Sequence, residues 1–109
     1  RALSMLYKFK SRAAADLIML EPQGRQMVTL MGKTPGASGI VTVAQIPEAI
    51  AALEAAVAAE EARQAEAAED QELTEQQRAE LVSLRQRVTP FIKMLRVSAA
   101  EKADVVWGV

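Results

Sequence analysis

The sequence predicts an α+β domain: a small antiparallel sheet packed against a long antiparallel helix pair and one short helix. Three observations predict it. The stretch from Leu81 to Leu95 places large apolar residues three and four positions apart, as one face of a helix requires. Residues 5–10 alternate along the chain, as a half-buried strand does. The chain closes on an apolar segment, 104–109, so the sheet would combine two N-terminal strands with this C-terminal one.

Length and composition indicate one globular domain with a modest core. The chain has 109 residues, of which 50% are hydrophobic and 25% charged. Much of the apolar share is alanine, which favours helix but buries little area. We expect residues 1–4 to be an extension before a natural start at Met5, and residues 5–109 to form the domain.

The composition also argues against several classes of function. The chain has no cysteine and no histidine, so thiolate chemistry, the commonest general base and the commonest transition-metal ligand are absent. We therefore expect a non-catalytic protein with no metal or cofactor. The net charge of −1 argues against nucleic acid and anionic membranes as partners. No apolar run approaches the ~20 residues of a membrane span and no signal peptide is visible, so we expect a cytoplasmic protein.

The first strand is predicted over Met5–Lys10, with Tyr7 and Phe9 on one side and two lysines on the other. The apolar run 17–20 suits a second strand, buried on both faces and antiparallel to the first. A helix over 12–20, favoured by three alanines, is the alternative. Residues 21–24 contain proline and glycine, which predicts a turn.

A short helix is predicted over Arg25–Gly32, ended by the glycine. The following Gly-Lys-Thr is not a phosphate-binding loop, because Met27 stands where that motif requires a glycine. Residues 36–39 are predicted to form a flexible loop. Thr42 and Gln45 then have capping-box spacing, and Pro47 suits the first turn of a helix. The apolar stripe of that helix comprises Ile46, Ile50, Leu53 and Val57.

An acidic segment, 58–77, follows, in which Leu73 is the only large apolar residue. We expect the helix to extend past the core, fray, and give way to a mobile acidic connection near 64–74. Thr74 and Gln77 repeat the capping-box spacing, so the last helix should run from Glu75 to about Val97.

Pro90 lies inside the last predicted helix. An internal proline costs about 3 kcal/mol, but burying about five large side chains contributes roughly 1.5–3 kcal/mol each. We therefore predict one kinked helix rather than two. A turn over 98–102 should then lead to the final strand, with Val105, Trp107 and Val109 on one side.

Several segments, in this order, resemble a bacterial family, the domain-of-unknown-function family 1840 of proteobacteria. The resemblance rests on Met5–Ser11, Asp16–Leu20, Gly32-Lys33, Ile46-Pro47 with the Ala-Leu-Glu helix, Ser83–Leu95 and Val105–Val109. It spans nearly the whole chain from Met5. It implies a small cytoplasmic single domain, and it brings no activity, substrate or catalytic residue.

Two functions fit these observations. The first is a protein-interaction domain acting as a homodimer, because an alanine-rich helix pair over a thin core leaves apolar surface to spare. The second is a small-ligand or anion-binding domain, because the first third of the chain is basic. Its predicted site comprises Tyr7, Lys8, Lys10, Arg12 and Arg25. Asp16 and Glu21 lack the paired spacing that acid–base catalysis would need, which places an enzyme behind both.

Overall fold

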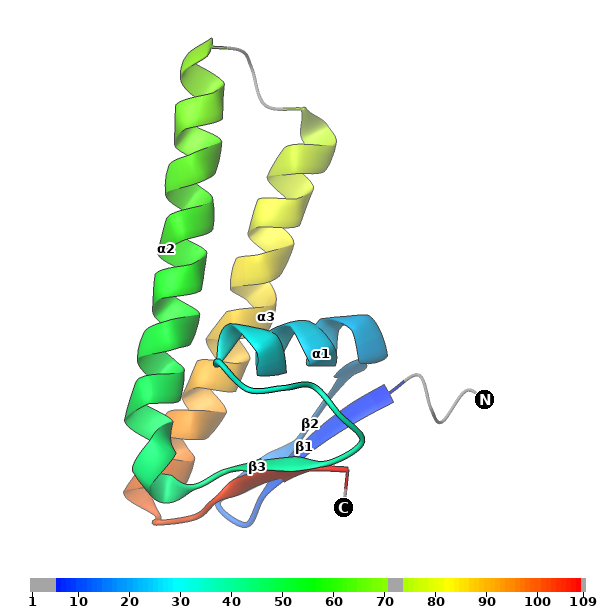
Figure 1. Ribbon diagram of the computed structural model, residues 1–109, viewed down its shortest axis with the longest axis vertical. Coiled ribbons are helices and arrows are strands. Elements are labelled where there is room, and N and C mark those ends of the chain that lie inside the picture. Colours follow the sequence, from blue (N-terminus) through cyan, green and yellow to red (C-terminus); the bar gives the residue numbers. More distant parts are fainter. Residues whose placement is uncertain (1–5, 71–73, 109) are drawn as a thin grey trace.

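The computed structural model describes residues 6–70 and 74–108, with only the backbone described at 67–70, 77 and 80–83. These residues form a sheet covered on one face by helices, two of which project as a long hairpin (Figure 1). This confirms the α+β class. The elements are β1 (Leu6–Ser11), β2 (Ala14–Leu20), α1 (Glu21–Leu30), β3 (Gly39–Val41), the 3-10 turn η2 (Val43–Gln45), α2 (Ile46–Asp70), α3 (Glu75–Ala100) and β4 (Val105–Trp107).

The sheet has the strand order β2-β1-β4-β3, and each neighbouring pair is antiparallel. The C-terminal segment joins the sheet as predicted, and β4 lies between β1 and β3, a central position that the sequence did not indicate. Phe9 of β1 pairs with Trp107 of β4, and both side chains are buried. β3 was not predicted, because three residues beginning with a glycine are too short to show an alternating pattern.

The core lies between the sheet and the helices. The predicted stripe of α3 is confirmed at five buried positions, although the side chain of Leu81 lies outside the described residues. α3 runs as one helix through Pro90. The buried apolar residues include Tyr7, Phe9, Met27, Val28, Val41, Ile46, Leu53, Val57, Leu84, Val88, Phe91, Ile92, Leu95, Val105 and Trp107.

β2 is a strand, as favoured over the helix, but the prediction that it is buried on both faces was wrong. Ile18 and Leu20 are each 53% exposed. The cause is position rather than composition, since β2 is an edge strand and the helices cover only one face of the sheet (Figure 1).

The segment 21–24 is the first turn of α1 rather than a loop. Proline is tolerated in the first helical turn, where its missing N–H has no helical partner anyway. Gly24 is buried against Tyr7, which explains the glycine by close packing instead of by a turn. Gly32 stops the helix as predicted, although the last helical residue is Leu30. Gly32 has a φ of +87°, and the Lys33 N–H donates to the Val28 carbonyl at 3.1 Å.

Both long helices begin where predicted. The side chain of Gln45 accepts a hydrogen bond from the Thr42 N–H at 3.0 Å, which stabilises the entry to α2. α3 continues to Ala100, so residues 98–100 are helical rather than part of a turn. Ser98 is fully buried there, and its hydroxyl donates to that of Ser11 at 2.7 Å. The extra turn of α3 is explained by the burial of Ser98 against the sheet.

Some predictions fall outside the described residues. These are the extension 1–4, the start of β1 at Met5, residues 71–73 of the acidic connection, and Val109. Residues 64–70 of that predicted connection belong to α2. The mobility of the acidic connection stays a prediction.

Candidate functional site

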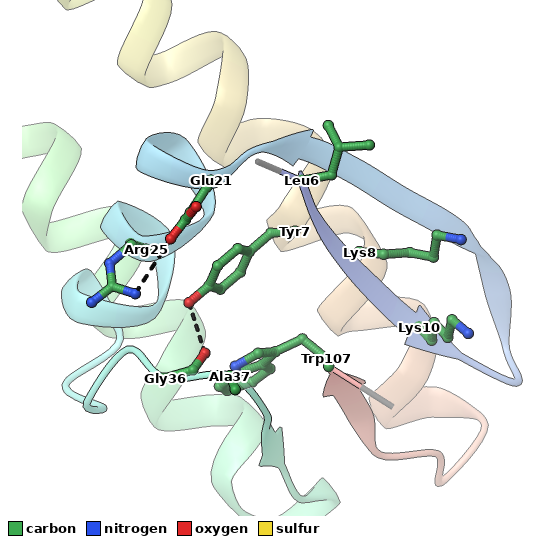
Figure 2. Close-up of a pocket in the computed structure, with 10 residues that line it drawn as sticks. Leu6, Tyr7, Lys8, Lys10, Glu21, Arg25, Gly36, Ala37 and Trp107 are labelled. Atoms are coloured by element: carbon green, nitrogen blue, oxygen red, sulfur yellow. Dashed lines mark hydrogen bonds and ion pairs between the residues drawn. The ribbon is translucent and has the colours of Figure 1, made fainter. Parts of the chain in front are cut away.

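A cleft of about 600 Å³ opens beside the N-terminal half of β1 (Figure 2). β4 ends at Trp107 opposite Phe9, so β1 continues past the end of its neighbour. α1 lies over one side of the cleft and the loop before β3 over another. The site is therefore a notch in the sheet, produced by strands of unequal length.

Four of the five predicted site residues line this cleft: Tyr7, Lys8, Lys10 and Arg25. The Tyr7 hydroxyl donates a hydrogen bond to the Gly36 carbonyl at 2.8 Å, which ties the loop to β1. Strand alternation directs the two lysines away from the tyrosine, as Figure 2 shows. The four residues therefore share a cleft without converging on one point.

Arg25 forms an ion pair with Glu21 at 3.7 Å, one helical turn earlier in α1. Both side chains are more than a third exposed, so the pair is weak and leaves the guanidinium accessible to a ligand. The cleft thus combines three cationic side chains with one carboxylate and one phenol. Such a lining suits a small anion better than a cation.

The structure places the fifth predicted residue, Arg12, away from the cleft. Its guanidinium donates to the carbonyls of Glu101 and Lys102, both at 3.0 Å. These carbonyls lie just beyond the end of α3, where cations interact favourably with the helix dipole. Arg12 therefore fastens the β1–β2 turn to the end of α3. The sequence did not indicate this contact, because Arg12 and Lys102 are 90 residues apart along the chain.

Sequence reasoning missed the contribution of Trp107 to the cleft wall. Its side chain is 2% exposed, so the indole belongs to the core as well as to the cleft wall. Its indole Nε1 is buried with no hydrogen-bond partner among the described residues. The Glu21–Arg25 spacing of four could have indicated a pair on one helix face, whereas nothing in the sequence indicates the orientation of the indole.

A second candidate surface lies on the sheet, and we call it the open face. It is the side of the sheet that the helices leave uncovered (Figure 1). Leu6 and Leu20 pair across β1 and β2, and Lys8 pairs with Ile18 beside them. The exposed fractions of its large apolar residues are 45% for Leu6, 53% for Ile18, 53% for Leu20 and 41% for Ile40. Its charged residues are Lys8, Lys10 and Asp16.

Neither surface holds a cluster of metal-binding side chains among the described residues. Within 6–70 and 74–108, no three Asp, Glu, His or Cys side chains are grouped so as to hold a metal ion. The described part of the chain has no ion pair between the charged residues of the open face. Both surfaces therefore offer binding groups.

A family model described as Domain of unknown function (DUF1840) matches residues 5–107, which extend from just before β1 to the end of β4. The chain belongs to this family. The match confirms the DUF1840 resemblance, and it carries no activity. No curated protein and no solved structure matches the DUF1840 chain. Among its described residues, no helix is both long and apolar enough to traverse a bilayer.

Proposed function

We propose that this DUF1840 protein is a non-catalytic protein-interaction domain that forms a homodimer through its sheet. The observation that carries the proposal is the open face. The helices cover one side of the sheet and leave Leu6, Ile18 and Leu20 about half exposed on the other. Exposed apolar side chains gathered on one surface mark interaction sites in small soluble domains.

The size of the core supports association. A domain of 109 residues with an alanine-rich helix pair buries limited apolar area, and small domains gain stability by pairing. The open face carries both signs of charge, with lysines on β1 and Asp16 on β2. A surface with both signs can be complementary to itself under a two-fold axis.

Sedimentation equilibrium between about 1 and 100 μM tests the proposal. We expect a monomer–dimer equilibrium that the double variant Ile18→Ser/Leu20→Ser weakens at least tenfold, a loss of roughly 1.4 kcal/mol. Val97→Ser is the matched control, because Val97 is also exposed and apolar but lies on α3. A monomer at every concentration, or equal weakening by both variants, contradicts a dimer formed through the sheet.

The second candidate is binding of a small anion in the cleft, favoured by the accessible guanidinium of Arg25 and by the two lysines that line the cleft from the other side of β1. A thermal-shift screen with millimolar phosphate, nucleotides and short RNA tests it, since a ligand that binds the folded state raises Tm. We expect Arg25→Gln to abolish any shift and Lys93→Gln, on the surface of α3, to preserve it. No shift with wild-type protein would retire this candidate. The bacterial origin and cytoplasmic location expected from the sequence stay predictions.

A further inference from the structure

Part of β1 is unpaired on the side of β4, although β1 is a central strand of the sheet. Residues 6–8 pair with β2 on one side. On the other side the pairs with β4 begin at Phe9, and no strand among the described residues lies beside 6–8. The turn and loop hydrogen bonds of the described backbone do not involve 6–8 either. Successive strand residues direct their N–H and C=O groups to opposite sides, so at least one of these residues presents both groups to the notch.

The residue after β4 keeps the notch open. Gly108 has φ of +76°, which turns the chain out of the strand direction. A Cβ at Gly108 would collide with the carbonyl of Ala37, so the chain packs directly on the loop before β3. β4 therefore does not continue along β1, and the unpaired segment borders the cleft of about 600 Å³. That volume lies within the ~300–1,000 Å³ of ligand sites.

The cationic side chains of the cleft lie on two sides of β1. Arg25 reaches the cleft from α1, on the side of Tyr7, whereas Lys8 and Lys10 point to the opposite side (Figure 2). A compact anion on one side of the strand cannot contact the cations on the other. The side chains of an extended chain alternate between two sides at each residue, so two successive acidic residues place one carboxylate on each. An extended acidic peptide therefore matches this arrangement better than a small anion does.

The wall of the cleft also contains a donor without an acceptor. Trp107 is 2% exposed, and its Nε1 has no hydrogen-bond partner among the described residues. Buried donors of this kind are rare in folded proteins, and a bound group is one common explanation. Trp107 is also the single tryptophan of the chain, so its fluorescence reports on binding at the notch.

We propose that the notch binds an extended acidic segment of a partner protein, which pairs with residues 6–8 of β1. In this mode of recognition, backbone hydrogen bonds supply affinity and the alternating side chains supply specificity. Residues opposed across two strands share a face, so the residue opposite Lys8 faces the lysines and the residue opposite Tyr7 faces Arg25. Two successive acidic residues therefore define the ligand. The inference extends the protein-interaction role proposed above and does not depend on the homodimer.

Titration of synthetic peptides against the wild-type protein, followed by the fluorescence of Trp107, tests the inference. The probe is acetyl-Thr-Val-Glu-Glu-Val-Thr-amide, whose two carboxylates lie on opposite sides of an extended chain. One control is acetyl-Thr-Glu-Val-Glu-Val-Thr-amide, which has the same composition but both carboxylates on one side. The other control replaces both glutamates of the probe with glutamine. We expect the probe to bind at least tenfold more tightly than either control. Equal affinities would overturn the inference.

Substitutions and backbone chemistry locate the bound peptide. Lys8→Gln and Arg25→Gln should each weaken binding of the probe at least fivefold, whereas Lys93→Gln, exposed on α3, should leave it unchanged. Strand pairing should slow amide exchange at residues 6–8. N-methylation of both glutamates of the probe should abolish binding, because one of two successive N–H groups must face β1.

The outcomes separate this inference from the functions proposed above. Stabilisation by millimolar phosphate without binding of the probe would overturn the peptide ligand and leave the small anion in place. Binding that survives N-methylation would overturn strand pairing. The monomer–dimer equilibrium is measured without peptide, so a monomeric protein that binds the probe supports the inference, and a dimeric protein that does not bind it overturns the inference alone.

Discussion

At the scale of single residues, Gly24 sets the distance between α1 and β1. A Cβ at this position would lie 2.4 Å from both Cβ and Cγ of Tyr7, atoms that cannot move without shifting the strand. Alanine in a helix gains about 1 kcal/mol over glycine, but overpacking of this kind costs more. We therefore expect Gly24→Ala to lower the free energy of unfolding by about 1–3 kcal/mol in urea titrations.

Gly36→Ala is the matched control for this substitution. Gly36 has ordinary φ, and nothing lies within 4 Å of its added Cβ. We expect the control to change stability by less than about 0.5 kcal/mol. Equal losses at the two positions would show that α1 and β1 are not as close as the structure has them.

Leu84 and Glu66 test where the core ends. Leu84 is 8% exposed on α3, whereas Glu66 is exposed on the outer part of α2. Leu84→Ala removes buried methyl groups and should cost about 2–5 kcal/mol, and Glu66→Ala should cost almost nothing. Denaturant titrations compare the two. Similar losses would contradict the division into a buried base and a solvated outer part of the hairpin.

At the scale of elements, the end of α3 depends on a residue in an unfavourable conformation. Lys102 has φ of +56°, and the Ala103 N–H donates to the Ser98 carbonyl at 2.8 Å to close the helix. Glycine adopts this conformation without the steric cost that a lysine bears. We expect Lys102→Gly to raise the free energy of unfolding by about 0.5–1 kcal/mol. Loss of stability in thermal melts would contradict this account of the helix end.

The outer part of α2 holds a carboxylate whose charged form is stabilised locally. Glu60 accepts hydrogen bonds from Arg63 and from Gln64, and these bonds hold its pKa below the ordinary value of 4.5. The stability that the lowered pKa supplies is present above the ordinary pKa and is lost as the pH falls through the folded-state value. We expect wild-type protein to exceed Glu60→Gln in stability at pH 6, with the difference shrinking by pH 3. A difference independent of pH would contradict it.

Elements with a long pattern could be predicted from the sequence, and short or context-dependent features could not. The stripe through Val88 and Leu95 gave α3 because its period extends over several turns. β3 has only three residues, which is too few to show a period. The exposure of Ile18 depends on which strand lies at the edge, a property of the whole sheet that no local pattern contains.

At the scale of the whole molecule, the candidate site was predictable only in part for the same reason. Residue type and nearness in sequence identified Tyr7, Lys8 and Lys10. The remainder of the cleft comes from α1, the loop before β3 and the end of β4, which the topology brings to one notch. Arg12 shows that nearness in sequence can also mislead. It is close to Lys10 along the chain, but it lies at the other end of β1 and contacts the end of α3.

The shape of the molecule predicts an uneven distribution of stability. The radius of gyration is 14.9 Å, against the ~13 Å typical of a compact domain of about 100 residues, because the hairpin projects beyond the sheet (Figure 1). Among the described side chains of α2, Gln64 alone is buried beyond Val57. The outer part of the hairpin therefore has little apolar burial to oppose local opening.

Native-state hydrogen exchange measures this distribution directly. We expect the amides of Leu53, Phe91 and Leu95 to exchange only through global unfolding, because these side chains are fully buried between the helices and the sheet. The amides of residues 62–66 should exchange at least tenfold faster, since local fraying exposes them without disturbing the core. Mild denaturant should accelerate the first group and leave the second nearly unchanged. Equal protection in both groups would mean that the hairpin and the sheet unfold as one cooperative unit, and that the ion pairs of the hairpin, such as Glu61–Arg85, contribute more than exposed pairs usually do.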